Sequence, residues 1–284
     1  MTARASIFDT RPCELGEGPL WHPERKQLFW FDVLGQQLRS RVGDQALTWD
    51  FDEIHSAAGW IDRDTLLLAS ETGLWRFDLE TGTRSRIVEL EADNPATRSN
   101  DGRADPMGGY WIGTMGKQAE PGMGKIYRYY RGELRCVVDG LTIPNALCFS
   151  GDGRLGYFSD TPTHRVYRQR LDADGWPEGE PELFLDLSEP GQYPDGAVVD
   201  RENHIWIALW GSGCVTRYRP DASLDRVVEV GGLHSSCPAF GGDDMTTLFV
   251  TTALEHLIDP DPAQGLVYVA ETEIKGRAEP KVIV

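Results

Sequence analysis

Short runs centred on aromatic and aliphatic residues recur along the chain at regular intervals. Six runs share this character: Leu28–Phe31, Leu66–Ala69, Tyr110–Gly113, Gly156–Ser159, Ile205–Ala208 and Leu248–Thr251. Their first residues lie 38 to 49 positions apart. Runs of this length are typical of buried strands, and a repeat of about 40–50 residues is typical of a propeller or a related array.

One polar or thiol residue stands ten or eleven positions before each run. These six residues are Glu17, His55, Asn100, Asn145, Asp195 and Cys237. Because equivalent positions in the blades of a propeller converge on one axis, we expect the six side chains to form a ring at the mouth of a central channel.

The intervening segments predict the rest of each repeat. Turn-forming sequences such as Ser150–Gly153 and Asp200–Asn203 lie before the apolar runs, and segments with strand-like alternation such as Lys125–Arg128 follow them. No helical period persists for even three turns, which disfavours a parallel sheet with helical crossovers. The sequence therefore predicts an all-β fold: residues 1–284 form a single six-bladed β-propeller domain of antiparallel four-stranded blades around a central channel.

The ends and the longest glycine-rich spacer carry further expectations. Ala5–Phe8 is expected to add an outer strand to the last blade, and Lys281–Val284 to form another strand, so that the overlapping ends close the ring. The polar, glycine-rich segment Gly116–Gly124 is expected to form a loop over one face.

Composition narrows the classes of partner. The 284 residues carry a formal net charge of −17, which argues against nucleic acid and against anionic membrane surfaces, because both require clustered Lys and Arg. The N-terminal segment has no apolar core of the kind found in signal peptides. The five cysteines, an odd number, include no C-x-x-C pair. A reduced, cytoplasmic protein without disulfides is expected, as a monomer or weak homo-oligomer.

The ring suggests a metal site. Glu17, Asn145 and Asp195 would present two carboxylates and an amide oxygen to one point, a set that suits a hard divalent cation. Asn100 offers a fourth oxygen, while His55 would add a nitrogen donor and favour zinc, iron or manganese. Taken singly, Asn and Asp beside Gly are more often turn residues; it is their recurrence at one repeat position that favours ligation. Cys237 is interpreted as a small buried packing residue.

Several motifs resemble one known family. The segments Leu15–Trp21, Arg98–Met115, Ile143–Leu147, Tyr193–Gly196 and Ser236–Gly242 are similar to those of the regucalcin/gluconolactonase (senescence marker protein) family of sugar lactonases, and the similarity runs from residue 15 to about 253. The resemblance implies a six-bladed propeller that binds one divalent cation (Ca, Zn, Mn, Mg or Fe) and hydrolyses sugar lactones.

Residue by residue, the resemblance implies roles for six positions. Glu17, Asn145 and Asp195 fall on the family's metal ligands, and Asp195 also on its proposed general base. Arg98 and Asn100 fall on substrate-contacting positions, as does Glu120 through its distance from the strand that begins at Gly124. His55 departs from the small residues usual at its position and is a possible site-lining residue.

Three functions remain open from the sequence. The first is a metal-dependent lactonase that opens an aldonolactone to its aldonic acid, with either Asp195 or a metal-bound hydroxide supplying the base or nucleophile. The second is a non-enzymatic, calcium-binding regulatory or scaffold propeller. The third is hydrolysis of other esters or of organophosphates at the same site.

Overall fold

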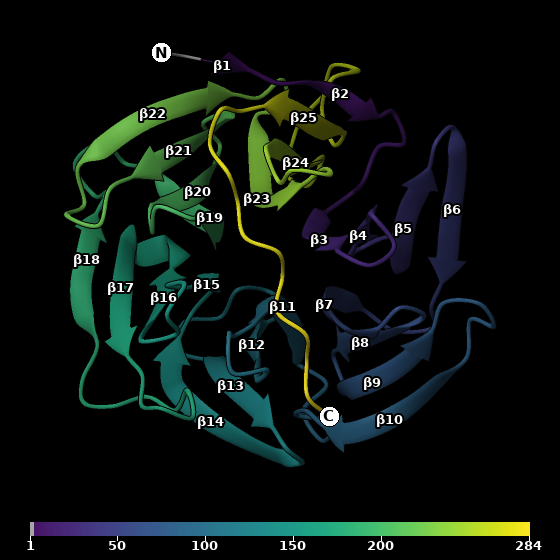
Figure 1. The fold of residues 1–284 in the computed structure, drawn as a ribbon, viewed down its shortest axis with the longest axis vertical. Helices are drawn as coiled ribbons and strands as arrows, with labels where there is room; N and C mark the ends of the chain where they lie inside the picture. The colour runs from purple at the N-terminus through teal and green to yellow at the C-terminus, as the bar shows by residue number, and fades with distance from the viewer. Residues whose placement is uncertain (1–2) are drawn as a thin grey trace.

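The computed structural model describes residues 3–284 and is built from strands (Figure 1). These residues form 25 strands and one 3₁₀ turn, η1 (Thr161–Thr163), and include no α-helix. Six sheets stand side by side around a central axis. The molecule is therefore a six-bladed β-propeller, and the predicted fold class is confirmed.

The first three blades follow the chain from their innermost to their outermost strand. Blade 1 consists of β3 (Gly16–His22), β4 (Gln27–Asp32), β5 (Gln37–Val42) and β6 (Gln45–Asp50). Blade 2 consists of β7 (His55–Asp62), β8 (Thr65–Ser70), β9 (Gly73–Asp78) and β10 (Arg84–Glu89). Blade 3 consists of β11 (Thr97–Ala104), β12 (Tyr110–Gly116), β13 (Gly124–Tyr130) and β14 (Glu133–Leu141).

Two of the remaining blades are built in the same way. Blade 4 consists of β15 (Pro144–Phe149), β16 (Leu155–Asp160), β17 (Arg165–Arg170) and β18 (Glu182–Asp186). Blade 5 consists of β19 (Tyr193–Val199), β20 (Ile205–Trp210), β21 (Cys214–Tyr218) and β22 (Leu224–Glu229). The six apolar runs of the sequence lie in the second strand of each blade, as predicted.

Both ends of the described chain contribute to closing the ring. Blade 6 combines β23 (His234–Gly241), β24 (Thr247–Ala253) and β25 (Val267–Glu271) with β2 (Ser6–Asp9), which pairs antiparallel with β25 as its outer strand. The predicted strand near residues 5–8 is thus confirmed. β1 (Ala3–Arg4) adds a short parallel pairing to the outer edge of blade 5.

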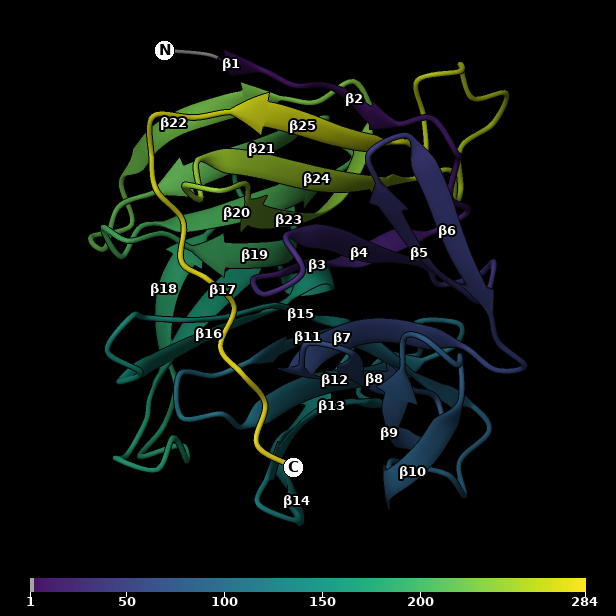
Figure 2. The ribbon, with the colours of Figure 1, turned by 45° about the vertical axis from the view of Figure 1, so that its right-hand side comes forward.

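The C-terminal tail, residues 272–284, does not form the strand predicted at Lys281–Val284, so that prediction was wrong. The tail instead crosses one face of the ring (Figures 1 and 2). Val282 N donates to Trp60 O at 2.9 Å, while Ile283 N donates to Gly108 O at 2.8 Å. Because these bonds go to two different blades, no continuous ladder can form.

Every innermost strand contains an irregularity at the polar position of the repeat. The register shifts where β3 passes Glu17, β7 passes His55, β15 passes Asn145, and at the equivalent points of β11, β19 and β23. A β-bulge bends its strand and re-aims a side chain. The bulges therefore make the direction of each polar side chain depend on the local backbone.

Apolar side chains fill the spaces between neighbouring blades. Between blades 1 and 2, Phe29 and Phe31 pack in one cluster with Leu66, Leu68 and Phe77. All five cysteines have free thiols, as expected. Among residues 3–284, no helix has the length and apolarity needed to cross a bilayer.

Candidate functional site

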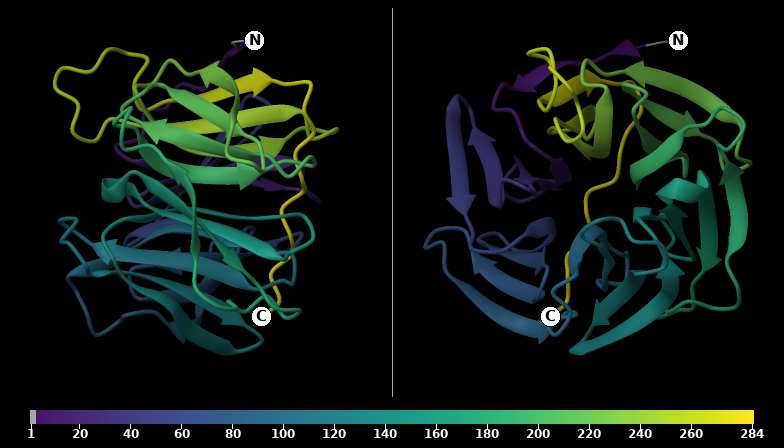
Figure 3. Two further views of the ribbon diagram at one scale, coloured as in Figure 1. Left: turned by 90° about the vertical axis from the view of Figure 1, so that its left-hand side faces the viewer. Right: turned by 180° about the vertical axis from the view of Figure 1, so that it is seen from behind.

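A cavity of about 690 Å³ opens at the end of the blades where the first strands begin. Its walls include Glu17, Asn145 and Asp195 together with Arg98 and Asn100. The structure therefore brings five of the predicted site residues to one place. The tail contacts the opposite ends of the blades, and Figure 3 (left) shows it on the other side of the molecule from the loop that follows β24.

A second set of lining residues follows a rule that the sequence interpretation missed. These residues lie at the end of, or just after, the second strand of their blade: Leu34, Lys117, Thr161, Trp210 and Glu255. In an antiparallel pair, the end of the second strand lies beside the start of the first. The repeat could therefore have identified this position too, because it recurs about 16 to 18 residues after the polar one in most blades.

The two carboxylates at the cavity repel one another. Burial, and then the charge of Asp101, raises the pKa of Glu17 to about 8. Burial, and then the charge of Glu17, raises the pKa of Asp195 well above its usual value. Neither carboxylate forms an ion pair with any residue in the described part of the chain. The pair is thus a concentration of negative charge, which the Arg98 guanidinium partly offsets without forming an ion pair.

Hydrogen bonds fix the amide of Asn145 next to these carboxylates. Asn145 Nδ2 donates to Thr161 Oγ1 at 2.9 Å, and Asn145 Oδ1 accepts from Asn100 Nδ2 at 2.8 Å. The hydroxyl of Thr161 donates in turn to Pro194 O at 2.7 Å, one residue before Asp195. The amide oxygen is therefore held in place and keeps a second lone pair for another partner.

The donor set fits a divalent cation of the oxygen-preferring kind. No group of three or more His, Cys, Asp and Glu side chains within residues 3–284 has the arrangement of a metal site, so a cation here depends on the amide oxygen of Asn145 as third ligand. Two carboxylates and one amide, with water completing the shell, suit a hard divalent ion. Such an ion would also stabilise the charged form of Glu17, whose pKa is raised mainly by burial and then by the charge of Asp101.

Arg98 and Asn100 form a polar wall beside this donor set. Arg98 Nη1 donates to Asn100 Oδ1 and to Ser99 O, both at 2.9 Å. Burial lowers the pKa of Arg98 from its usual value, and the charge of Glu255 is the largest influence opposing this change. Nε and Nη2 of Arg98 make no hydrogen bond to the residues described, so two donors remain for a ligand in the cavity.

Glu120 and His55 lie elsewhere. Glu120 is not among the residues that line the cavity. Its carboxylate folds back over Gly116 and accepts from Gln118 N at 3.0 Å. The loop containing Glu120 does reach the cavity, but through its neighbours Lys117, Gln118 and Ala119.

The His55 ring is buried away from the cavity. Its Nδ1 lies 3.1 Å from Glu53 O and its Nε2 lies 3.0 Å from Arg84 Nη1, while the ring packs 4.1 Å from that of Phe51. Burial lowers the pKa of His55 to about 3, with Arg84 adding to the effect. His55 therefore links two strands of its blade as a neutral side chain.

Cys237 is a buried packing residue, as expected. Its side chain is 1% exposed, and its sulfur occupies the space that a β-carbon at Gly196 would need. Burial raises the pKa of the thiol well above its usual value. The residue next to Asp195 must therefore be glycine while Cys237 fills this position.

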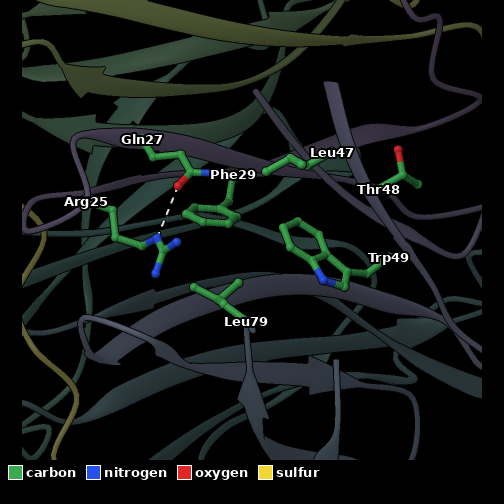
Figure 4. Close-up of a pocket in the computed structure, with 7 residues that line it drawn as sticks. All are labelled: Arg25, Gln27, Phe29, Leu47, Thr48, Trp49 and Leu79. Atoms are coloured by element: carbon green, nitrogen blue, oxygen red, sulfur yellow. Dashed lines mark hydrogen bonds between the residues drawn. The ribbon is translucent and has the colours of Figure 1, made fainter. Parts of the chain in front are cut away.

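A smaller cavity, of about 280 Å³, lies between blades 1 and 2 (Figure 4). Phe29, Trp49 and Leu79 provide much of its wall. Arg25 is already bonded there to Gln27, at 3.1 Å, and paired with Asp64. This cavity contains none of the predicted site residues and carries no group suited to catalysis.

Comparison with known proteins identifies the family to which the chain is similar. Residues 15–254 match the family described as "SMP-30/Gluconolactonase/LRE-like region". An L-arabinolactonase from Azospirillum brasilense is 37% identical over 287 residues, covering 96% of this chain and 93% of its own. The pentonolactonase XacC of Haloferax volcanii is 35% identical over 257 residues, covering 87% and 84%.

A solved structure shows the same fold over its whole length. The calcium-binding protein regucalcin from Agrobacterium tumefaciens strain C58 is 39% identical, with a TM-score of 0.97 and coverage of 100% of both chains. The family match spans all six polar repeat positions and ends just after β24 of the sixth blade. This chain therefore belongs to the SMP-30/gluconolactonase/LRE-like family.

Proposed function

We propose that this protein is a divalent-cation-dependent hydrolase that opens sugar lactones to aldonic acids. The observation that carries the proposal is the meeting of Glu17, Asn145 and Asp195 in one cavity, where burial and mutual repulsion raise the pKa of the carboxylates. The names of two relatives, L-arabinolactonase and pentonolactonase, support the same reaction.

In this reaction Glu17, Asn145 and Asp195 would hold the cation, and Asp195 would also act as the base. A divalent cation, when bound by Glu17, Asn145 and Asp195, supplies a Lewis acid that polarises the lactone carbonyl. Asp195 removes a proton from the attacking water, which adds to the carbonyl carbon. The ring C–O bond then breaks, and its oxygen takes the proton held by Asp195 to become the free hydroxyl of the aldonic acid, which returns Asp195 to its ionised form. A positioned base of this kind typically contributes about 10²–10⁴-fold to the rate.

Arg98 and Asn100 suit a polyhydroxylated substrate. The free Nε and Nη2 donors of Arg98 can bind two adjacent oxygens of a sugar ring, because the guanidinium is a planar fork. Lys117 and Glu255 place further charged groups at the wall. Trp210 and Ile143 provide an apolar surface for the sugar's C–H groups.

The test is acid release from L-arabinono-, D-galactono- and D-gluconolactone, followed with a pH indicator. Protein stripped with a chelator is compared with the same protein after addition of Ca²⁺, Mg²⁺, Mn²⁺ or Zn²⁺. We expect turnover that falls at least 100-fold on stripping and returns with at least one ion. The matched variants are Asp195→Asn, expected to be inactive, and Asp243→Asn, which makes the same change on an exposed turn and should retain full activity.

Two results would contradict the proposal in different ways. Turnover that survives both stripping and Asp195→Asn would exclude the cation mechanism. Tight Ca²⁺ binding without turnover of any lactone would instead favour the non-enzymatic calcium-binding protein, a reading suggested by the name of the regucalcin structure.

A further inference from the structure

The backbone is strained directly after one candidate ligand. Ala146, which follows Asn145, has φ of 56°, in the left-handed region. Gly18, which follows Glu17, has a nearly equal φ of 54°. Glycine adopts this conformation without penalty, but a β-carbon makes it unfavourable. Ala146 therefore needs support from its surroundings to remain in the bulge that aims Asn145.

Two buried charged side chains hold the next residue. Leu147 N donates to Asp101 Oδ2 at 2.7 Å, and Arg103 Nε donates to Leu147 O at 3.1 Å. The side chains of Asp101 and Arg103 come from β11 and are almost wholly buried. Because they hold both polar groups of Leu147, they restrict the peptide on each side of it.

Arg103 connects this arrangement to the opposite face of the propeller. Its Nη1 forms a buried ion pair with Glu279 Oε1, and the side chains of both residues are 8% exposed. Glu279 belongs to the C-terminal tail, where its carbonyl accepts from Trp60 Nε1 at 2.8 Å. A chain of direct contacts thus runs from the tail through Arg103 and Leu147 to the bulge beside Asn145.

We propose that Asp101, Arg103 and Glu279 form a positioning clamp that holds the amide of Asn145 in its ligating orientation, so that the C-terminal tail sets the cation affinity of a site on the other face. This inference rests on the proposed function, because it takes Asn145 as a ligand. A buried ion pair gains little net stability once desolvation is counted. We therefore attribute to the Arg103–Glu279 pair a role in fixing one local conformation.

Calorimetric titration of the chelator-stripped full-length protein with Ca²⁺ and with Mn²⁺ tests the clamp. Glu279→Gln and Glu279→Ala are expected to weaken cation binding by about 10–100-fold, the usual effect of losing a residue that supports a ligand. Adding Ala146→Gly to Glu279→Ala is expected to recover most of that loss, because glycine needs no clamp to adopt a positive φ. Ala146→Gly alone should change affinity less than about threefold.

The control is Asp9→Ala, which removes the buried partner of Arg11 on β2, the outer strand of blade 6. It should lower the melting temperature but leave cation affinity unchanged. Wild-type protein that binds neither ion would overturn the proposed function and the clamp together. Binding that is unaffected by both Glu279 variants, or a loss that Ala146→Gly does not reverse, would overturn the clamp alone.

Discussion

Arg98 illustrates how one side chain divides its donors between structure and ligand. Nη1 donates to Asn100 and Ser99, while Nε and Nη2 donate to none of residues 3–284. A lysine at this position could keep the charge but not the paired geometry. Arg98→Lys is therefore expected to raise KM for a sugar lactone by about 10–100-fold, the effect of one or two lost charge-assisted hydrogen bonds, with a smaller change in kcat. Steady-state kinetics on cation-loaded protein would show it, and an unchanged KM would contradict it.

His55 makes stability depend on pH. Its pKa is lowered to about 3 in the folded protein, so between pH 3 and about 6.5 the unfolded chain binds the extra proton. The contribution of His55 to the free energy of unfolding is therefore fully present above pH 6.5. It is lost as pH falls, by about 2 kcal/mol at pH 5. His55→Gln should flatten this part of the stability curve, measured by urea unfolding at pH 7 and pH 5.

The matched control for this measurement is His256→Gln. The His256 side chain is 79% exposed, so its replacement should leave the difference in unfolding free energy between pH 7 and pH 5 as in the wild type. A wild-type difference that persists in His55→Gln would show that other groups carry the acid sensitivity.

The residues at the repeat positions could be identified from the sequence, but the directions of their side chains could not. Glu17, Asn145 and Asp195 could be found from the sequence because they recur at one point of the repeat and match family motifs. His55 occupies the same point, yet its ring is held by Glu53 and Arg84. The direction of a side chain at a bulge depends on backbone angles and on partners in other strands, and neither leaves a signal in a single sequence.

At the scale of the element, the bulge in β3 depends on a glycine. A β-carbon at Gly18 would overlap the carbonyl oxygen of Ser56, and its φ is 54°. Gly18→Ala is expected to destabilise the protein by about 2–3 kcal/mol, since it adds steric overlap to backbone strain. It should also weaken cation binding, because Glu17 lies on the same bulge. Urea unfolding and calorimetry measure the two effects.

Gly43 provides the matched control for Gly18. It has an almost identical φ of 55°, but no atom lies within 4 Å of the position of its β-carbon. Gly43→Ala should therefore cost only the strain, about 1 kcal/mol, without any effect on cation binding. Equal losses of stability in the two variants would show that the contact with Ser56 is unimportant.

The strands were easier to predict than the segments between them. The second and third strands of the blades follow from their apolar and alternating patterns. The tail at Lys281–Val284 has a similar apolar pattern but bonds singly to two different blades. Pattern alone cannot distinguish a strand from an extended segment that lies across a protein surface, because both bury alternate side chains.

For the whole molecule, closure of the ring depends on β2. This strand pairs with β25 through Ser6, Ile7 and Asp9, and Phe8 packs edge-on against Phe249 at 4.9 Å. Deletion of residues 1–9 is expected to cost about 3–5 kcal/mol, from a few ladder hydrogen bonds and the two aromatic contacts of Phe8, with Phe249 and Trp30. This corresponds to a fall of roughly 10 °C in the melting temperature.

Deletion of residues 1–4 is the control for this truncation, because it removes β1 but keeps β2. It should lower the melting temperature much less, since β1 contributes only two paired residues. If the two truncated proteins had the same melting temperature, β2 would contribute little to the stability of blade 6.

The pairing of β2 with β25 also constrains how the protein can be made on a ribosome. β2 is synthesised well before its partner β25, which ends at Glu271. At a typical rate of 5–20 residues per second, roughly 13 to 50 s separate their synthesis. Throughout that interval the nascent blades form an open arc, with an unpaired strand edge and an uncovered apolar side at each end. Chaperone demand during translation should therefore be greatest just before β25 is made, and should fall once the last blade is complete.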